Sequence, residues 1–313
     1  MALGWSVLIF IVAAGGTLVL GLLLKWVDRK VTAKVQWRVG PPWYQPMADV
    51  IKLMGKESFM PMTARGTGFL LAPVIALAAT GAAAAILWYA LIHSEGAFLG
   101  DLIVVLYLLV IPAAMTILGA SASGNPHAAI GAGREIKLLL SYELPMLLAI
   151  LVAVAHNNWS LRLDAFSGAR PALYSISGVL AFIVAMLCAQ AKLGQVPFDL
   201  AEAECEIMSG VYVEYSGSSL AMFLMSRAML LALMPLLLIV VFWGGLGAGA
   251  WYDYVFFILK YLLLVALVTL IRNTNPRVRI DQAVRFFWFR LTPIVVVAMV
   301  LALAGASNKI PWL

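Results

Sequence analysis

The sequence has few charged residues and very few of the side chains that hold metals or redox centres. Of its 313 residues 12% are charged and 64% are hydrophobic, whereas soluble domains carry about 25% charged residues. A soluble chain of this length needs far more polar surface, so the composition excludes a soluble enzyme. The two cysteines, Cys188 and Cys205, make neither a disulfide framework nor a metal cluster. Because iron–sulfur and haem spacings are also missing, we expect no metal or cofactor in this chain.

The basic residues outnumber the acidic ones by 21 to 15, but they do not indicate nucleic-acid binding. They gather at the ends of apolar runs, which is a pattern of membrane topology. The first run, from Leu3 to Val27, is followed by basic residues and not by a small-residue cleavage site. It therefore predicts a spanning helix rather than a signal peptide.

Eight apolar runs predict membrane-spanning helices, because about 20 residues at about 1.5 Å each cover the hydrocarbon core. The runs lie at about 3–27, 69–92, 102–120, 136–155, 175–195, 221–243, 252–271 and 289–306. The predicted fold is an all-α integral membrane protein with one polytopic domain over residues 1–313.

The loops between these runs alternate in charge. Nearly all lysines and arginines fall on one side, which includes loops 28–66, 196–220 and 272–288, whereas the other side has only Arg162, Arg170 and Lys309. The positive-inside rule makes the basic side cytoplasmic. With eight spans in the inner (plasma) membrane, both termini are then expected outside.

One cytoplasmic loop carries a predicted amphipathic helix. Within residues 41–57, Met47, Val50, Ile51 and Met54 recur at spacings of three and four. This spacing places them on one helical face, and such a helix is expected to lie along the membrane interface.

The segment 196–217 is the most acidic part of the chain and holds one third of its 15 acidic residues. The five carboxylates are Asp199, Glu202, Glu204, Glu206 and Glu214. If residues 199–210 are helical, Asp199, Glu202 and Glu206 share one stripe, with Glu204 on the opposite side. Their repulsion is expected to raise at least one pKa toward neutrality, as a proton relay requires. The alternative is a solvated loop whose acids pair with neighbouring basic loops.

Two ionisable residues fall inside predicted spans. Glu143 lies in the fourth span beside Pro145, which frees the carbonyl of Ser141 one turn back. An ionisable group within a membrane span is a candidate for ion transfer, with structural pairing to an arginine as the alternative. Lys260 in the seventh span is a weaker candidate, because its long stem can reach the outer surface.

Four segments together resemble subunit 1 of NADH dehydrogenase, the membrane subunit of respiratory complex I that meets the peripheral arm. They are residues 28–41 (DRKVTAKVQWRVGP), 133–145 (GREIKLLLSYELP), 197–204 with 214–217 (PFDLAEAE and EYSG), and 272–281 (RNTNPRVRID). The resemblance runs in order along essentially the whole chain. Residues 40–49 (GPPWYQPMAD) are shorter than the matching stretch of complex I members. This short form looks more like the homologous subunit of group 4 energy-converting [NiFe] hydrogenases, which include formate hydrogenlyase.

This resemblance implies a non-catalytic subunit of an oxidoreductase complex that docks a cytoplasmic redox arm and couples it to proton or sodium translocation. The implied ion pathway comprises Glu143, Asp199, Glu202, Glu204, Glu206, Glu214, Asp281 and Lys260. The residues implied in docking the arm or balancing these acids are Arg29, Arg38, Arg134, Arg272, Arg277 and Arg279.

The partners implied by the resemblance are hydrogenase-like large and small subunits, an iron–sulfur subunit and antiporter-like membrane subunits. The iron–sulfur clusters and the nickel–iron centre are expected on those partners. Two alternatives remain: a quinone-binding subunit of a complex I-type oxidoreductase, and an anchor whose carboxylates only hold the arm in place.

Overall fold

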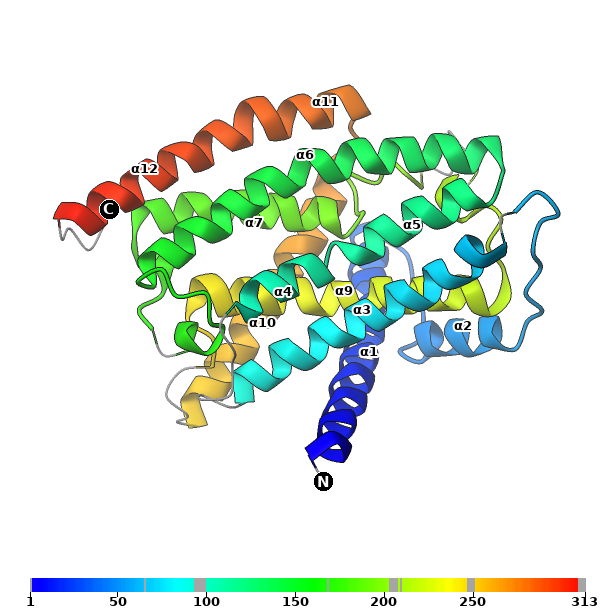
Figure 1. Ribbon diagram of the computed structural model, residues 1–313, viewed down its shortest axis with the longest axis horizontal. Coiled ribbons are helices and arrows are strands. Elements are labelled where there is room, and N and C mark those ends of the chain that lie inside the picture. Colours follow the sequence, from blue (N-terminus) through cyan, green and yellow to red (C-terminus); the bar gives the residue numbers. More distant parts are fainter. Residues whose placement is uncertain are drawn as a thin grey trace.

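The computed structural model describes residues 2–64, 66–92, 100–167, 169–202, 208, 210–246 and 251–308, with the backbone alone for 2–7 and 306–308. In these ranges the chain is helical and contains no strand (Figure 1). The α-helices are α1 (Ala2–Val35), α2 (Gln45–Met54), α3 (Gly66–Ile92), α4 (Asp101–Leu108), α5 (Ile111–Ala122), α6 (Pro126–His156), α7 (Ile176–Lys192), α9 (Gly217–Trp243), α10 (Trp251–Thr274), α11 (Ile280–Arg285) and α12 (Thr292–Asn308). Short 3-10 turns occur at η1 (Asp164–Phe166), η2 (Ala172–Tyr174) and η3 (Gly210–Tyr212), and a π-helical turn, η4 (Phe286–Leu291), joins α11 to α12.

Seven helical segments of the described chain are long and apolar enough to cross a membrane. They correspond to α1, α3, α4 with α5, α6, α9, α10, and α11 with α12. The all-α membrane fold predicted from the sequence is therefore confirmed. The fifth predicted span, 175–195, instead becomes the 17-residue helix α7, which is shorter than a typical crossing of about 20 residues.

Helix α7 is short because the chain leaves the helix at Lys192 and folds back against α9 as an irregular segment. Irregular backbone is tolerated in a membrane protein where it is buried in protein or lines a water-filled cavity. Side-chain and main-chain groups satisfy the polar backbone here: Gln190 Nε2 donates to the Val196 carbonyl at 2.9 Å. The Val278 N–H donates to the Pro197 carbonyl at 3.1 Å. The segment is thereby fixed between α7 and the loop after α10.

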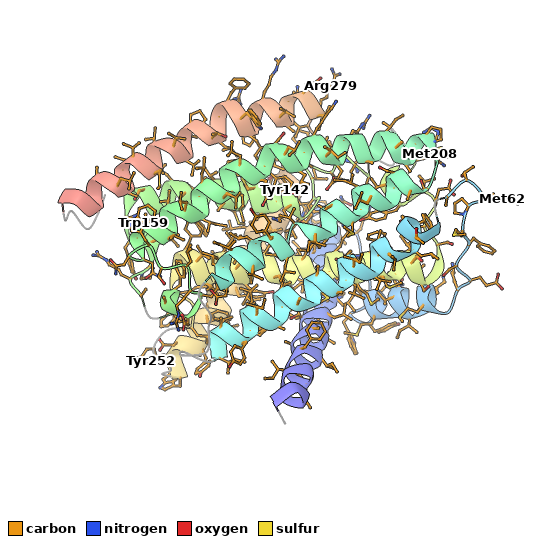
Figure 2. All side chains as sticks on the ribbon, viewed as in Figure 1. Met62, Tyr142, Trp159, Met208, Tyr252 and Arg279 are labelled. Atoms are coloured by element: carbon orange, nitrogen blue, oxygen red, sulfur yellow. The ribbon has the colours of Figure 1, made fainter. Side chains whose placement is uncertain are left out.

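Helix α9 is the centre of the bundle. Its hydrophobic window is 89% buried, whereas those of α1 and α10 are 22% buried. Helices α1 and α3 pack most closely against it, α5, α6 and α7 also contact it, and α12 lies along α6 and α7 (Figure 1). The largest fully buried side chains include Tyr142, Phe242 and Phe287. The outer faces of α1, α10 and α12 expose apolar side chains, as expected for surfaces that meet lipid (Figure 2).

The predicted amphipathic helix is confirmed as α2. Its Val50 packs in a small cluster with Leu22 of α1 and Met225 of α9. Ile51 is 70% exposed, so only part of the apolar face of α2 packs against the rest of the bundle. An ion pair between Arg29 and Asp49 at 3.0 Å ties α2 to α1. The helix is thus a fixed part of the bundle and retains an apolar face for the membrane or a partner.

Candidate functional site

Two cavities meet at the irregular segment after α7. The outer cavity has a volume of about 530 Å3 and lies between α1, α9, α10 and residues 193–199. The inner cavity has a volume of about 50 Å3 and lies between α5, α6, α9 and η3. Because a water molecule needs roughly 10–15 Å3 of such space, both have room for water. Leu193, Gly194, Asp199, Glu202 and Arg227 line both cavities, so these residues form the wall between them.

The outer cavity is strongly charged. Eight of its fifteen lining residues are ionisable. They are Lys25, Asp28, Arg29, Asp199, Glu202, Arg227, Arg272 and Arg277. Arg272 forms an ion pair with Asp28, and Arg277 pairs with Asp199 at 2.8 Å. The arginines of the loop after α10 therefore balance acids of α1 and of the irregular segment, and five cations against three acids leave the cavity positive.

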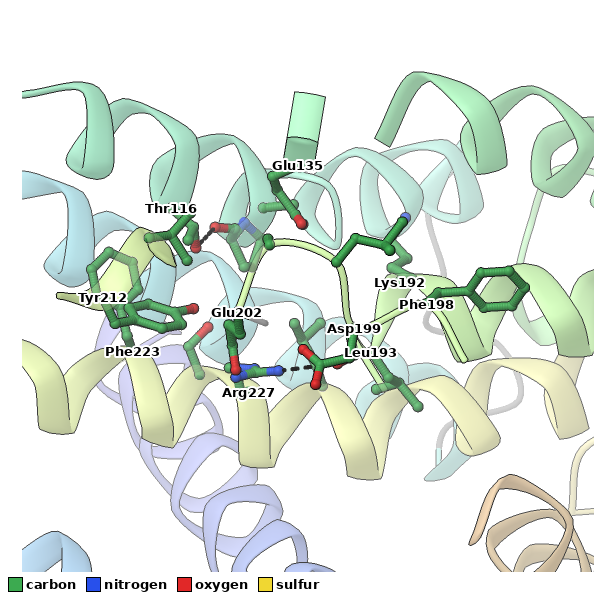
Figure 3. A pocket seen from close by; sticks show the side chains of 18 of the residues that line it. Thr116, Glu135, Lys192, Leu193, Phe198, Asp199, Glu202, Tyr212, Phe223 and Arg227 are labelled. Carbon is green, nitrogen blue, oxygen red and sulfur yellow. Dashed lines mark hydrogen bonds and ion pairs between the residues drawn. The ribbon is translucent and has the colours of Figure 1, made fainter. Parts of the chain in front are cut away.

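Arg227 and Glu202 form the ion pair at the wall between the cavities. Arg227 projects from α9, whereas Glu202 lies on the irregular segment, and Figure 3 shows this segment looping between Arg227 and Glu135. Arg227 also donates to the Gly194 carbonyl at 3.4 Å and lies 5.9 Å from the centre of the Tyr212 ring. Arg227 thus contacts both ends of the segment 194–202. If Glu202 loses its charge, the ion pair at one end of the segment is lost and only the hydrogen bond to the Gly194 carbonyl remains.

The ion pair between Lys192 and Glu143 lies beside the inner cavity. Glu135 of α6 and Lys192 at the end of α7 both line it. Lys192 Nζ lies 3.2 Å from Glu143 Oε2, and the lysine side chain is only 2% exposed. The ammonium also lies 5.9 Å from the centre of the Tyr142 ring. The ionisable groups therefore follow one another from Glu202 past Glu135 and Lys192 to Glu143.

Asp199 lies in an environment that disfavours its charge. Burial raises the pKa of Asp199 above its ordinary value, and the neighbouring charge of Glu202 raises it further, while Arg277 and Arg227 lower it. A carboxyl with a raised pKa is a better proton acceptor and donor near neutral pH than a free aspartate. Burial is thus the larger cause of the raised pKa of Asp199, and repulsion by Glu202, the cause expected from the sequence, is the smaller one.

The predicted helical stripe over 199–210 is wrong for the part of it that the structure describes. Residues 199–202 are irregular, and residues 210–212 form the 3-10 turn η3. Pro197 and the buried side chains of Phe198 and Leu200 fit the segment into the bundle without a helix. Asp199 and Glu202 still line the same two cavities, but through chain reversal rather than helical periodicity.

The other implied pathway residues lie away from the cavities or outside the described chain. Glu214 accepts a hydrogen bond from Asn125 Nδ2 at 2.5 Å, at the start of α6. Asp281 is exposed on α11. Lys260 donates to the Trp243 carbonyl at 3.2 Å, near the opposite end of α9. Glu204 and Glu206 lie outside the described residues.

The implied docking arginines divide into two groups. Arg29, Arg272 and Arg277 line the outer cavity and pair with carboxylates of this chain. Arg38 and Arg279 are exposed, and Arg134 is half-buried on α6. The first group balances internal charge, whereas Arg38 and Arg279 are open to the surroundings of the chain.

Sequence reasoning missed three residues as members of the site: Glu135, Lys192 and Arg227. Glu135 lies two helical turns before Glu143 in α6, so it shares a helix with a residue that the sequence does identify. Lys192 follows an apolar run and therefore resembles a loop cation, although a lysine in this position can turn back into the bundle. Across the described part of the chain, no group of three or more His, Cys, Asp or Glu is placed to hold a metal ion.

The chain resembles known respiratory proteins in sequence and in fold. Residues 6–303 match the sequence model of the family described as NADH dehydrogenase. The chain is 32% identical to an NADH-quinone oxidoreductase subunit from Dehalococcoides mccartyi, over 94% of this chain and 85% of that one. It is also 32% identical to the corresponding subunit from Brevibacillus brevis, over 96% of this chain and 94% of that one.

A solved structure with a similar fold is a chain of the membrane-bound sulfane sulfur reductase, an archaeal respiratory membrane complex. The TM-score is 0.82 and the identity 28%, over 95% of this chain and 99% of that one. This chain therefore belongs to the NADH dehydrogenase family, as a multi-pass membrane subunit of a respiratory complex of the NADH-quinone oxidoreductase type.

Proposed function

We propose that this subunit couples a cytoplasmic redox arm to ion movement, and that the Arg227–Glu202 pair is the element that changes state. The observation that carries the proposal is the position of this pair, in the wall between a wide charged cavity and a small inner one. A coupling element needs two arrangements whose balance another site can alter. In this proposal the ion pair between α9 and the irregular segment is closed when Glu202 is ionised and open when Glu202 is protonated.

Protons enter from the outer cavity. Asp199, whose pKa is raised, accepts a proton at the cavity wall and passes it to Glu202. Neutral Glu202 no longer attracts Arg227, so the wall loosens and the proton reaches the inner cavity. Glu135 receives it there, and the Lys192–Glu143 pair carries the change in charge to the far side of α6. From Glu143 the proton or the change in field passes to neighbouring membrane subunits.

In this proposal the redox arm controls from the cytoplasmic side whether the Arg227–Glu202 ion pair is closed or open. The end of α1 with the loop 36–44, and the loop 275–279, border the outer cavity or lie beside it. The exposed Arg38 and Arg279 on these loops fit a partner with acidic groups. Docking or redox chemistry there changes the field on Asp28, Arg272 and Arg277. In this proposal the iron–sulfur clusters and the metal centre belong to the arm, and this chain supplies only ionisable side chains.

The arm that we propose is of the [NiFe] hydrogenase type, as the shortened loop 40–49 indicates. The likeness to a chain of the sulfane sulfur reductase, over 99% of that chain, supports a second candidate, an arm that reduces sulfur compounds. In both cases this subunit binds no quinone. Sites for small organic molecules are mostly apolar with a few polar groups, whereas eight of the fifteen residues around the outer cavity are ionisable.

The test compares coupling with chemistry in the intact complex. The purified complex is reconstituted in liposomes, and its metals and subunits are identified before its redox activity is measured with an artificial electron donor. Glu202→Gln is expected to leave that activity intact and to abolish ion uptake into the liposomes. The matched control is Glu57→Gln, which neutralises an exposed carboxylate away from both cavities. Full ion uptake by Glu202→Gln contradicts the proposed coupling, and a bound quinone in the outer cavity favours the quinone-binding alternative.

A further inference from the structure

A third cavity lies on the other side of the irregular segment from the two that form the candidate site. Its volume is about 580 Å3 and it lies between α7, α10 and the π-helical turn η4. Its walls include the apolar side chains of Leu187, Ile271 and Phe286, and its lining contains two arginines, Arg285 and Arg290, but no carboxylate. Both arginines are exposed, and neither forms an ion pair with another described residue.

The π-helical turn brings the two arginines to the same cavity. In an α-helix, residues five apart point about 140° away from each other, because the helix has about 3.6 residues per turn. A π-helix closes its hydrogen bonds from i to i+5, so residues five apart come to nearly the same face. Residues Phe286–Leu291 form this turn, and both Arg285 and Arg290 line the cavity. The π-helical turn thus places both arginines at one cavity.

The surroundings of the cavity are those of a membrane interface. Trp288 and Phe289, between the two arginines, are 50% and 75% exposed, and exposed aromatic side chains beside basic ones are typical of the headgroup level. An apolar stripe leads away from the cavity along α7. It consists of Ile176, Val179 and Ile183, all exposed and spaced three and four residues apart, and Leu187 continues it into the cavity.

We propose that this cavity binds an anionic phospholipid. Its phosphate is held by Arg285 and Arg290, and one acyl chain lies along the stripe of α7. Two arginines that line one cavity and form no ion pair with a described residue fit a phosphodiester, which accepts hydrogen bonds from guanidinium groups. An apolar stripe that starts at the arginines fits the hydrocarbon chain attached to that phosphate. A free phosphate ion has no acyl chain, and a zwitterionic lipid carries a cationic amine beside its phosphate, which the two guanidinium groups repel.

This lipid also supports the candidate functional site. Phe198 lines both the third cavity and the inner cavity, and its ring lies 4.9 Å from that of Phe287. Val278, which lines the third cavity, donates its N–H to the Pro197 carbonyl. Asp199 follows directly. A lipid in this cavity therefore packs against the outer side of the segment whose inner side carries the acids, although its binding does not depend on the function proposed above.

The test measures the lipid that stays with the intact complex. The complex is purified, depleted of loose lipid with detergent and examined by native mass spectrometry after exposure to vesicles of phosphatidylcholine with or without phosphatidylglycerol. We expect wild type to retain phosphatidylglycerol, and its affinity to fall roughly fivefold for each of Arg285→Gln and Arg290→Gln. The matched control is Lys34→Gln with Lys52→Gln, which removes two exposed positive charges far from the cavity.

A further variant tests the acyl chain without changing charge. Leu187→Trp fills the groove, so it is expected to weaken retention of phosphatidylglycerol while the subunit composition stays constant. Equal retention by wild type and by the double arginine variant overturns the proposal. So does stabilisation of the complex by inorganic phosphate as large as that by phosphatidylglycerol. Loss of a partner subunit from the arginine variants, with lipid retention unchanged, shows that a protein occupies the groove instead.

Discussion

Lys192 and Glu143 form a 3.2 Å ion pair between α7 and α6, with the lysine side chain almost fully buried. A lysine in such a place is stabilised by its carboxylate partner and by the Tyr142 ring. Removing one charge of a buried pair leaves the other uncompensated, which is costly, whereas removing both is far less so. The pair thus links the stability of the bundle to the protonation state of Glu143.

The first prediction follows from this pair. Lys192→Met alone is expected to lower the free energy of unfolding by about 3 kcal/mol, because Glu143 loses its partner. Glu143→Gln together with Lys192→Met is expected to recover most of that loss. Thermal unfolding of the purified complex measures both. If the two single effects simply add in the double variant, the two groups are not energetically coupled.

The second prediction separates stability from coupling at the same pair. Glu143→Gln keeps the side-chain volume but cannot carry a proton, so ion uptake by reconstituted liposomes is expected to stop while dye-linked redox activity persists. The double variant Glu143→Gln with Lys192→Met is expected to remain uncoupled, although it is more stable than Lys192→Met alone. Restored ion uptake in that variant would assign Glu143 to structure alone.

The third prediction concerns Arg227. Arg227→Gln removes the cation that pairs with Glu202 and holds the Gly194 carbonyl, so the wall between the cavities is expected to open permanently. The complex should then leak protons at rest, measured as collapse of an imposed pH gradient in liposomes. Arg170→Gln, which changes an exposed arginine outside both cavities, is the control. If liposomes with Arg227→Gln keep the imposed pH gradient as long as wild type does, the Arg227–Glu202 pair is not the barrier to protons.

The fourth prediction concerns pH. The pKa of Asp199 is raised by burial and by Glu202, and Arg277 opposes this rise. Arg277→Gln therefore raises the pKa further, and the acidic limb of the coupled activity is expected to move to higher pH. Glu202→Gln removes a repelling charge and should lower the pKa of Asp199, which infrared titration of the carboxyl bands reports. A downward shift with Arg277→Gln contradicts the assignment.

The raised pKa of Asp199 also makes the stability of the folded chain depend on pH. Because folding disfavours the ionised form of Asp199, the protonated form is the better packed one, and its contribution is lost as pH rises through the folded pKa. Asp199→Asn mimics the protonated form at every pH. It is expected to unfold at the same temperature as wild type at low pH and at a higher temperature at neutral pH.

The fifth prediction concerns orientation. Loop residue Ser58 is expected to face the cytoplasm, and Tyr174, which is 68% exposed in the turn before α7, the outside. In a chain with Cys205 replaced by serine, an impermeant thiol reagent added to intact cells should modify Tyr174→Cys but not Ser58→Cys. The buried Cys188 stays unlabelled. Labelling of Ser58→Cys but not of Tyr174→Cys would show that the topology is opposite to the predicted one.

The sequence predicted most of the fold, because runs of about 20 apolar residues have few alternatives in a bilayer. It could not predict that the fifth run ends early. The residues up to Gln195 are compatible with a longer helix, and only tertiary contacts such as that between Gln190 and the Val196 carbonyl favour the turn. The same contacts decide which charges meet. Composition alone identifies Asp199 and Glu202, but Lys192 and Arg227 join them only because the chain reverses.

The early end of α7 has an electrical consequence. The outer cavity admits water and ions up to the wall formed by Arg227 and Glu202, so that region stays close to the potential of the solution on its side. The membrane voltage then falls across the remainder of the bundle, a thinner layer than the whole membrane, and the local field there is correspondingly steeper. One charge moved through the full drop works against about 2.3 kcal/mol for each 100 mV. In the proposed pathway, the step from Glu202 toward Glu143 lies beyond the outer cavity, and its rate is expected to depend on membrane potential more than the rate of proton entry does.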